Sequence, residues 1–68
     1  MEDFQQRVVD EKAELDERLG RLQQFIASSP VFEGLNVVER DLLERQHTHM
    51  VAYSAVLGER IASFEVSA

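Results

Sequence analysis

The chain contains no cysteine, a single proline and only three glycines among its 68 residues. The absence of cysteine excludes disulfide staples, thiol nucleophiles and thiolate metal sites. No apolar run approaches the roughly 20 residues that a membrane-spanning helix needs. No secretory signal is expected either, since Met1 is followed by two acidic residues rather than by a basic and then an apolar segment. We therefore expect a soluble, cytoplasmic protein without a membrane partner.

Basic residues are also scarce, with 7 against 13 acidic residues and a net charge of -6. An acidic chain meets repulsion at every phosphate of a nucleic acid, so neither DNA nor RNA is expected as a partner. A small anionic ligand is compatible with this charge if several basic groups converge. Because neither predicted helix holds such a cluster alone, the cluster would need both helices or several chains.

At 68 residues the chain is expected to form one small domain, residues 1–68. Chains of this length bury only about 60% of their unfolded surface, so they are marginally stable as monomers. Without disulfides, self-association is the remaining way to gain core. We therefore expect a homo-oligomer.

The residues from about 4 to 27 are predicted to form the first helix, with Asp3 as its N-cap. Apolar residues spaced three and four apart form a seam along this helix, and Lys12 occupies the one seam position that lacks an apolar residue. Gly20 lies inside this helix at a cost of about 1 kcal/mol relative to alanine. It indicates either a tolerated glycine or the close approach of another helix or a ligand. The apolar seam consists of Val8, Leu15, Leu19, Leu22 and Ile26.

A single helical turn from Pro30 to Glu33, capped by Ser29, is expected between the long helices. Asn36 then opens the second helix, residues 37–65, with Glu39 as its capping-box partner. Alternating spacings of three and four predict its seam, in which three positions carry an amide, a phenol and a guanidinium. The seam residues are Leu43, Gln46, Met50, Tyr53, Leu57, Arg60 and Phe64.

These elements predict an all-α fold, an antiparallel two-helix hairpin of residues 4–27 and 37–65 that assembles into a helical-bundle oligomer. With the turn placed midway through the connection, Lys12 is expected opposite Tyr53 and Arg60 opposite Gln5. Gly58 lies one turn from Tyr53 and is expected to leave room beside the resulting polar cluster.

His47 and His49 are not expected to bind a metal. Two residues apart on a helix, they point about 200° apart and cannot chelate one ion. Neither an H-x-x-x-H spacing nor a cysteine is present. Carboxylates are plentiful, but there is no phosphate-binding loop, nucleophile elbow or concave scaffold. We therefore expect neither catalysis nor a cofactor, and we interpret the histidines as exposed or interface residues.

The polar seam has two interpretations. As structure, Lys12 and Arg60 extend their charged ends into water, and Tyr53 satisfies its hydroxyl group locally. Gln46 would then fix the helix register. As a site, Arg7, Lys12 and Arg60 would bind phosphates while Tyr53 stacks on a base. Periodicity alone favours the structural interpretation.

Two stretches resemble a family of very short tailed-phage proteins. QRVVDEKAELDERLGRLQQF, residues 6–25, matches the family's opening motif Q-R-V-x-x-E-K-x-E-L-D. RQHTHMVAYSAVLGERI, residues 45–61, matches its closing motif R-Q-x-x-x-M-x-x-Y-x-x-x-L-x-x-R-I. The family occurs in crAss-like and other phages. In architecture it is similar to the helical hairpins of phage anti-CBASS and anti-Thoeris sponges, which oligomerise and sequester cyclic-nucleotide or ADP-ribose-derived immune signals.

The resemblance implies a phage accessory protein in the cytoplasm of an infected bacterium. It would sequester a nucleotide-derived host immune signal, of the cyclic oligonucleotide or cyclic ADP-ribose type, without catalysis. Two other functions stay open: an acidic protein-binding module that inhibits a host enzyme or regulator, and a ligand-free structural hairpin. The ligand-binding positions that the resemblance implies are Arg7, Glu11, Lys12, Arg45, Gln46, Tyr53 and Arg60.

Overall fold

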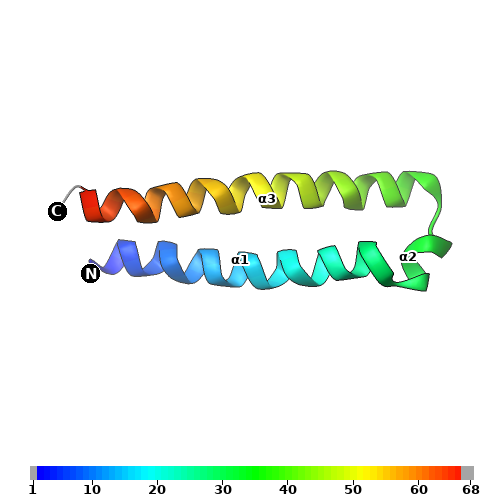
Figure 1. Cartoon of the computed structure of the whole chain (residues 1–68), viewed down its shortest axis with the longest axis horizontal. Coiled ribbons are helices and arrows are strands. Elements are labelled where there is room, and N and C mark those ends of the chain that lie inside the picture. Colours follow the sequence, from blue (N-terminus) through cyan, green and yellow to red (C-terminus); the bar gives the residue numbers. More distant parts are fainter. Residues whose placement is uncertain (1, 67–68) are drawn as a thin grey trace.

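The computed structural model describes residues 2–66, and the side chains of residues 2–64. Three helices follow one another: α1 (Asp3–Ser28), α2 (Pro30–Gly34) and α3 (Val37–Val66). Figure 1 shows α1 and α3 side by side and antiparallel, with α2 in the connection between them. The resulting rod measures 50 × 15 × 15 Å. The all-α class is confirmed, and the chain has three helices because the connection itself is helical.

Both long helices begin with a side chain that bonds a free backbone N–H. The N–H of Glu2 donates to Oε1 of Gln5 at 2.9 Å, and Glu2 is the N-cap of α1. The predicted cap, Asp3, is instead the first helical residue. The prediction is wrong by one residue because Gln5, three positions after Glu2, bonds back to it. At α3 the expected cap is confirmed, since Oδ1 of Asn36 accepts from the N–H of Glu39 at 2.8 Å.

The connection packs onto the end of α1. Oγ of Ser29 accepts from the N–H of Val31 at 3.2 Å and so caps α2, as predicted. The rings of Phe25 and Phe32 meet edge to face with their centroids 5.9 Å apart. Phe32 is thereby buried, which holds α2 against α1.

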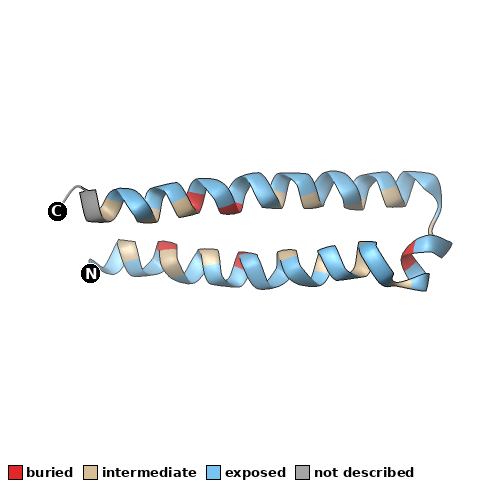
Figure 2. Ribbon diagram, in the orientation of Figure 1, coloured by how far each residue is buried: buried red, intermediate tan, exposed pale blue. Residues whose placement is uncertain are grey.

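The main core is small and lies in the half of the α1–α3 pair that is remote from α2 (Figure 2). Its buried apolar side chains are Val8, Leu15 and Leu57, of which Leu57 is 1% exposed. Met50, Ile61 and Phe64 pack around them. The ring of Phe64 also meets the ring of Phe4 edge to face at 5.8 Å. A core of this size gives a two-helix unit little stability of its own.

The predicted seam of α1 is confirmed, and that of α3 is correct only at every seventh residue. In α1 Val8 and Leu15 are buried, and the other three seam residues are half-buried. In α3 the correctly predicted positions are Leu43, Met50, Leu57 and Phe64. The positions between them are His47, Ser54 and Ile61, whereas the predicted Gln46, Tyr53 and Arg60 are exposed.

This error in α3 has a physical origin. Two sets of α3 residues fit the three-and-four spacing, the predicted set and the one that faces α1 in the structure. We call each set a phase. Both phases contain Leu43, Met50, Leu57 and Phe64, so spacing alone cannot distinguish them. The structure places apolar Ile61 inside and Arg60 outside, where the guanidinium stays in water. The rest of the interior phase follows from that choice.

Replacing Leu57 by alanine tests the position of the core. Truncating a buried leucine typically costs about 2–5 kcal/mol, so Leu57→Ala is expected to unfold much of this small chain. Val56→Ala, at the adjacent side chain that is 52% exposed, is expected to change the free energy of unfolding by at most about 0.5 kcal/mol. Urea unfolding at low protein concentration, followed by circular dichroism, measures both. Equal losses would contradict this core.

Candidate functional site

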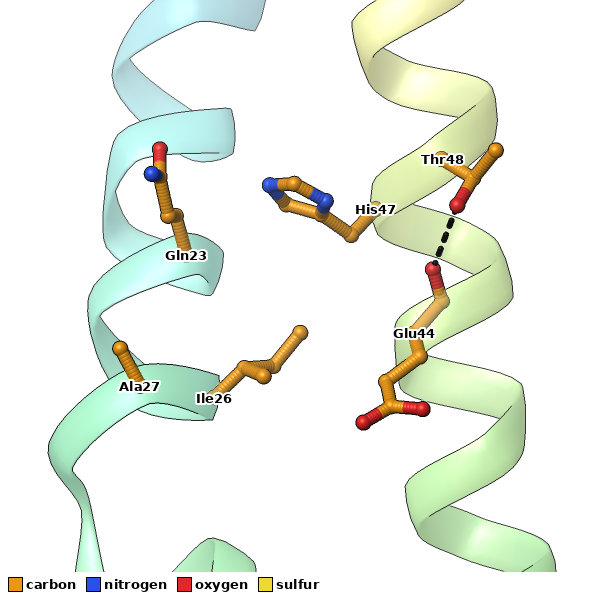
Figure 3. A pocket seen from close by; sticks show the side chains of 6 residues that line it. All are labelled: Gln23, Ile26, Ala27, Glu44, His47 and Thr48. Carbon is orange, nitrogen blue, oxygen red and sulfur yellow. Dashed lines mark hydrogen bonds between the residues drawn. The ribbon is translucent and has the colours of Figure 1, made fainter.

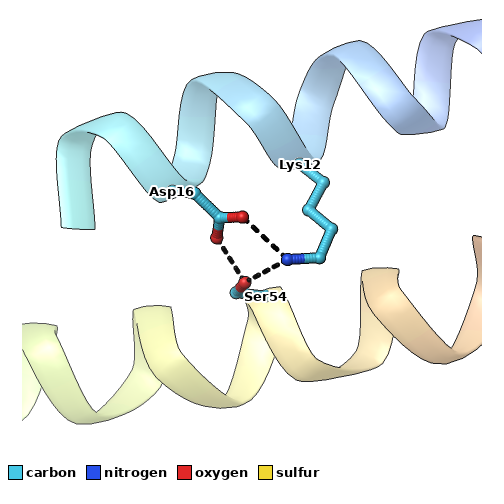
Figure 4. A network of polar contacts seen from close by, with 3 residues as sticks. All are labelled: Lys12, Asp16 and Ser54. Carbon is cyan, nitrogen blue, oxygen red and sulfur yellow. Dashed lines mark hydrogen bonds and ion pairs between the residues drawn. The ribbon is translucent and has the colours of Figure 1, made fainter. Parts of the chain in front are cut away.

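A polar network crosses the seam between α1 and α3 (Figure 4). Nζ of Lys12 donates to Oδ2 of Asp16 at 2.7 Å and to Oγ of Ser54 at 3.0 Å. The hydroxyl group of Ser54 in turn donates to Oδ1 of Asp16. Each of the three side chains therefore bonds both of the others. We call this arrangement the polar triangle.

Gly58 leaves room for the stem of Lys12. A methyl group at Gly58 would lie 3.3 Å from Cε of Lys12, which is tighter than an ordinary van der Waals contact. The space expected beside Tyr53 is thus occupied by Lys12 itself. The partner of Lys12 across the seam is Ser54 rather than Tyr53, because the interior phase of α3 differs by one residue from the predicted one.

The polar triangle holds charge in place and is poorly suited to moving a proton. The hydrogen bond from Lys12, and after it the one from Ser54, lowers the pKa of the Asp16 carboxyl below its ordinary value of 3.8. A carboxylate with a lowered pKa is a weak base, and an ammonium group has no lone pair. Activation of the Ser54 hydroxyl as a nucleophile would need a stronger acceptor. The triangle is therefore a structural contact between the helices.

Gln46, Tyr53 and Arg60 lie outside the seam, contrary to the predicted register. Tyr53 is 45% exposed, and the other two are also exposed. Their separation of seven residues places them on one side of α3, about two turns apart. Leu42, His49 and Val56, which are also seven residues apart, lie on the same side of α3. We call this surface, which consists of Leu42, Gln46, His49, Tyr53, Val56 and Arg60, the α3 flank.

Of the other predicted site residues, Arg45 adjoins the α3 flank, three residues after Leu42 and four before His49, whereas Arg7, Glu11 and Lys12 lie on α1. Nη2 of Arg7 bonds the carboxylate of Asp3 at 2.8 Å, and Nη1 of Arg45 lies 3.7 Å from that of Asp41. Both are exposed pairs four residues apart on a helix, which contribute only a few tenths of a kcal/mol. Glu11 is exposed on α1. The predicted residues therefore form separate groups rather than one site.

A concave region lies near the end of the α1–α3 pair that α2 connects. A cavity of about 280 Å³ is lined by Gln23, Ile26, Ala27, Glu44, His47 and Thr48 (Figure 3). A cavity of about 260 Å³ is lined by Phe32, Val37, Arg40, Asp41 and Glu44. Because Glu44 lines both cavities, they are neighbours. We call the two together the connection groove.

Two half-buried residues of this groove, Arg40 and His47, were not predicted as site residues. His47 occupies a seam position between the helices, in agreement with the interface alternative of the prediction, and His49 is exposed. A signal was available, because Arg40, His47 and Ser54 are polar residues at intervals of seven, the spacing of a helix face. That spacing identifies a site only when it is known which residues of α3 face α1.

The described residues contain neither a metal-binding cluster nor a membrane-spanning helix. Among its side chains, no group of three or more His, Cys, Asp or Glu residues is arranged to hold a metal ion. His47 lies between the helices while His49 is exposed, so the two imidazoles do not share a site. None of the helices within residues 2–66 combines the length and apolar character needed to cross a bilayer.

Comparison with known proteins assigns a family. The profile of the family named Sequestin matches residues 2–63, which includes α1, α2 and most of α3. The chain belongs to the Sequestin family. The Sequestin name suggests sequestration of a ligand, which means binding rather than catalysis. No curated protein and no solved structure matches the chain.

Asp16 gives the stability of the chain a defined pH dependence. Because folding lowers its pKa, its contribution is present above the ordinary value of 3.8 and is lost as the pH falls through the lower folded value. Asp16→Asn is therefore expected to lower the melting temperature near neutral pH, and its difference from wild type should shrink in acid. Glu14→Gln, exposed on the same helix, is the control and should differ little at any pH. A difference for Asp16→Asn that did not change with pH would contradict this role.

Proposed function

We propose that the chain sequesters a small nucleotide-derived immune signal, of the cyclic oligonucleotide or cyclic ADP-ribose type, in a bacterium infected by a phage. Membership in the Sequestin family supports a sequestering role. The class of signal and the phage origin are part of the proposal, and they rest on the two sequence motifs. The protein binds the signal in the cytoplasm without turning it over and without a cofactor.

The exposed side chains of the α3 flank are the main structural support for this proposal. Tyr53 is 45% exposed there, and the guanidinium of Arg60 takes no part in the ion pairs of the described residues. An exposed phenol ring can stack on a base, and a guanidinium can bond a phosphate twice. Seven residues of helix rise about 10.5 Å, which suits a ligand longer than a mononucleotide. A phenol ring and a guanidinium at this spacing match the base and the phosphate of an anionic aromatic ligand.

A second copy of the chain completes the proposed site, because one side of a single helix cannot enclose a ligand. The chain exposes 5152 Å², whereas a compact monomer of 7.8 kDa is expected to expose about 4,400 Å². Apolar side chains of α3 contribute to this surface, each at least 46% exposed: Val37, Val38, Leu42, Val51 and Val56. Burial of some of them against another copy would supply the core that the α1–α3 pair lacks.

The remaining predicted site residues take their places in such an assembly. Arg7 and Arg45 can exchange their exposed ion pairs for ligand contacts at small cost. Glu11 is exposed on α1, four residues after Arg7. Lys12 keeps its bonds to Asp16 and Ser54. Its contribution to the site is to hold α3 against α1.

Sedimentation tests the assembly. At micromolar concentrations the protein is expected to sediment as a species larger than 7.8 kDa. Leu42→Asp and Val56→Asp change exposed positions outside the core, so they should reduce assembly while the helicity is kept. Gln24→Asp, exposed on α1, is the control and should assemble as wild type. A folded wild-type species of 7.8 kDa alone would contradict the proposed oligomer.

Ligand binding tests the function itself. Cyclic dinucleotides, cyclic trinucleotides and cyclic ADP-ribose isomers would each be incubated with the protein and assayed by thermal shift. A ligand present at a hundred times its Kd stabilises the folded state by about 2.7 kcal/mol. Denaturation should then release the bound ligand unchanged, whereas a hydrolysed ligand would contradict sequestration. Failure of every ligand would favour the acidic protein-binding module or the structural hairpin.

Variants of the α3 flank belong to the same experiment. Loss of a charge-assisted hydrogen bond costs about 1.5–3 kcal/mol of binding, and loss of a base-stacking ring about 1–3 kcal/mol, so Arg60→Ala and Tyr53→Ala should each remove most of the ligand-induced stabilisation. Both residues are exposed, so the helicity should persist. Arg21→Ala is the matched control, because the guanidinium of Arg21 lies 3.6 Å from Glu17 on α1 and outside the α3 flank. Loss of assembly or of melting temperature without ligand would instead make these residues structural.

A further inference from the structure

The connection groove has features that the proposed function does not use. Figure 3 shows the ring of His47 and the carboxylate of Glu44 extending from α3 into the gap, with Gln23 and Ile26 on α1 across from them. The cavities of about 280 and 260 Å³ meet at Glu44. The groove therefore joins an apolar wall, several hydrogen-bonding groups, one cation and the carboxylates of Asp41 and Glu44.

Two buried nitrogen atoms of this groove have no hydrogen-bond partner. They are Nε of Arg40 and Nε2 of His47, and no other buried side-chain polar atom among the described residues is left in this way. Buried polar atoms in folded proteins nearly always have a partner, so each exception needs an explanation. Arg40 and His47 are seven residues apart on the seam side of α3, so both atoms border the same groove. The groove therefore contains two half-buried polar side chains whose hydrogen-bonding capacity the protein does not fully use.

Arg40 also lacks a charge partner. The ion pairs of the described residues do not include it, and the neighbouring Asp41 is paired with Arg45 at 3.7 Å. The buried ring of Phe32 lines the same cavity and removes water from one side. A half-buried, unpaired guanidinium in such surroundings favours a phosphate, to which it can donate two parallel hydrogen bonds.

The neighbours of Arg40 match the rest of a nucleotide. The carboxylate of Glu44 can only accept hydrogen bonds, and ribose hydroxyl groups are donors of the kind that acidic residues bind in nucleotide sites. The amide of Gln23 offers a donor and an acceptor, the pair that recognises the edge of adenine. The side chain of Ile26 presents an apolar surface to the face of a base.

We propose that the connection groove binds an adenine ribonucleotide group, with its phosphate at Arg40, its ribose at Glu44 and its base between His47, Gln23 and Ile26. Each cavity is slightly smaller than the roughly 300–1,000 Å³ of small-molecule sites, and only the two together reach that range, so the groove fits a single nucleotide unit that spans both. This inference goes beyond the proposed function by adding a second contact region for the ligand. It rests on the proposed function for the class of ligand.

The test is an NMR titration of the full-length, ¹⁵N-labelled protein with AMP, adenosine and inorganic phosphate. AMP should shift the Nε–H of Arg40, the imidazole of His47 and the side-chain amide of Gln23. Arg40→Gln should weaken the binding of AMP and phosphate by about tenfold or more and leave adenosine binding unchanged. His47→Leu, which places an apolar residue at a seam position, should weaken AMP and adenosine and leave phosphate unchanged.

Two further variants keep the result interpretable. Arg18→Gln removes an exposed arginine that has no ion pair in the described chain, and it should bind AMP as wild type. Arg40→Lys keeps the charge but not the two parallel bonds, so its AMP affinity should lie between those of wild type and Arg40→Gln. Circular dichroism checks that each variant keeps its helicity.

The outcomes separate the groove from the proposed function. If Arg40→Gln binds AMP as tightly as wild type, or if AMP shifts only the resonances of Tyr53 and Arg60, the groove proposal is wrong and sequestration still stands. If none of the three probes shifts a groove resonance, the groove proposal is also wrong. If AMP binds at Arg40 and His47 but no cyclic nucleotide stabilises the chain, the groove proposal holds and the proposed function is wrong.

Discussion

The polar triangle of Lys12, Asp16 and Ser54 fixes how α1 and α3 pair. The apolar contacts around it are few, and apolar surfaces are not directional, so they distinguish weakly between helices displaced by one turn. Hydrogen-bonded charges distinguish strongly, because a displaced register would leave the half-buried ammonium of Lys12 without Ser54. One polar layer in an apolar seam therefore specifies a single register. The connection groove, which residues of α1 and α3 line together, has its observed shape only in that register.

The two long helices differ in how far their sequences determine them. In α1 every seam position except Lys12 is apolar, so the phase of that helix follows from spacing alone. In α3 two phases share Leu43, Met50, Leu57 and Phe64, and the apolar body of Tyr53 favours the wrong one. Helices pack about 8–10 Å apart, and at that distance the small Ser54 and Gly58 leave volume for the stem of Lys12. Such packing involves residues more than 40 positions apart in the chain, and no local spacing encodes it.

The candidate site is less predictable than the fold, because it depends on this same phase. A change of one residue rotates a helical position by about 100°. That rotation moves Gln46, Tyr53 and Arg60 from the seam to the α3 flank, and it moves His47 from the surface into the connection groove. The sequence motifs identify polar side chains that stand out from an ordinary helix, but they do not assign those side chains to a face. Arg40 lies outside both motifs, and its place on the seam side of α3 can be assigned only when the inward-facing residues of that helix are known.

A thin pair of helices is better suited to binding a signal than to transforming it. Catalysis needs groups held rigidly against a transition state, and the chain has few buried side chains to hold them. Sequestration needs affinity alone, which a second copy can supply by covering the ligand. If the chain sequesters a small nucleotide as proposed, its charge of -6 contributes to selectivity. A nucleic acid would bring a long array of phosphates against the acidic surface, whereas a small anion meets mainly the arginine it touches, since exposed charges are screened beyond about 8 Å at physiological salt. An acidic chain with a few well-placed arginines can therefore accept a small nucleotide and still reject DNA and RNA.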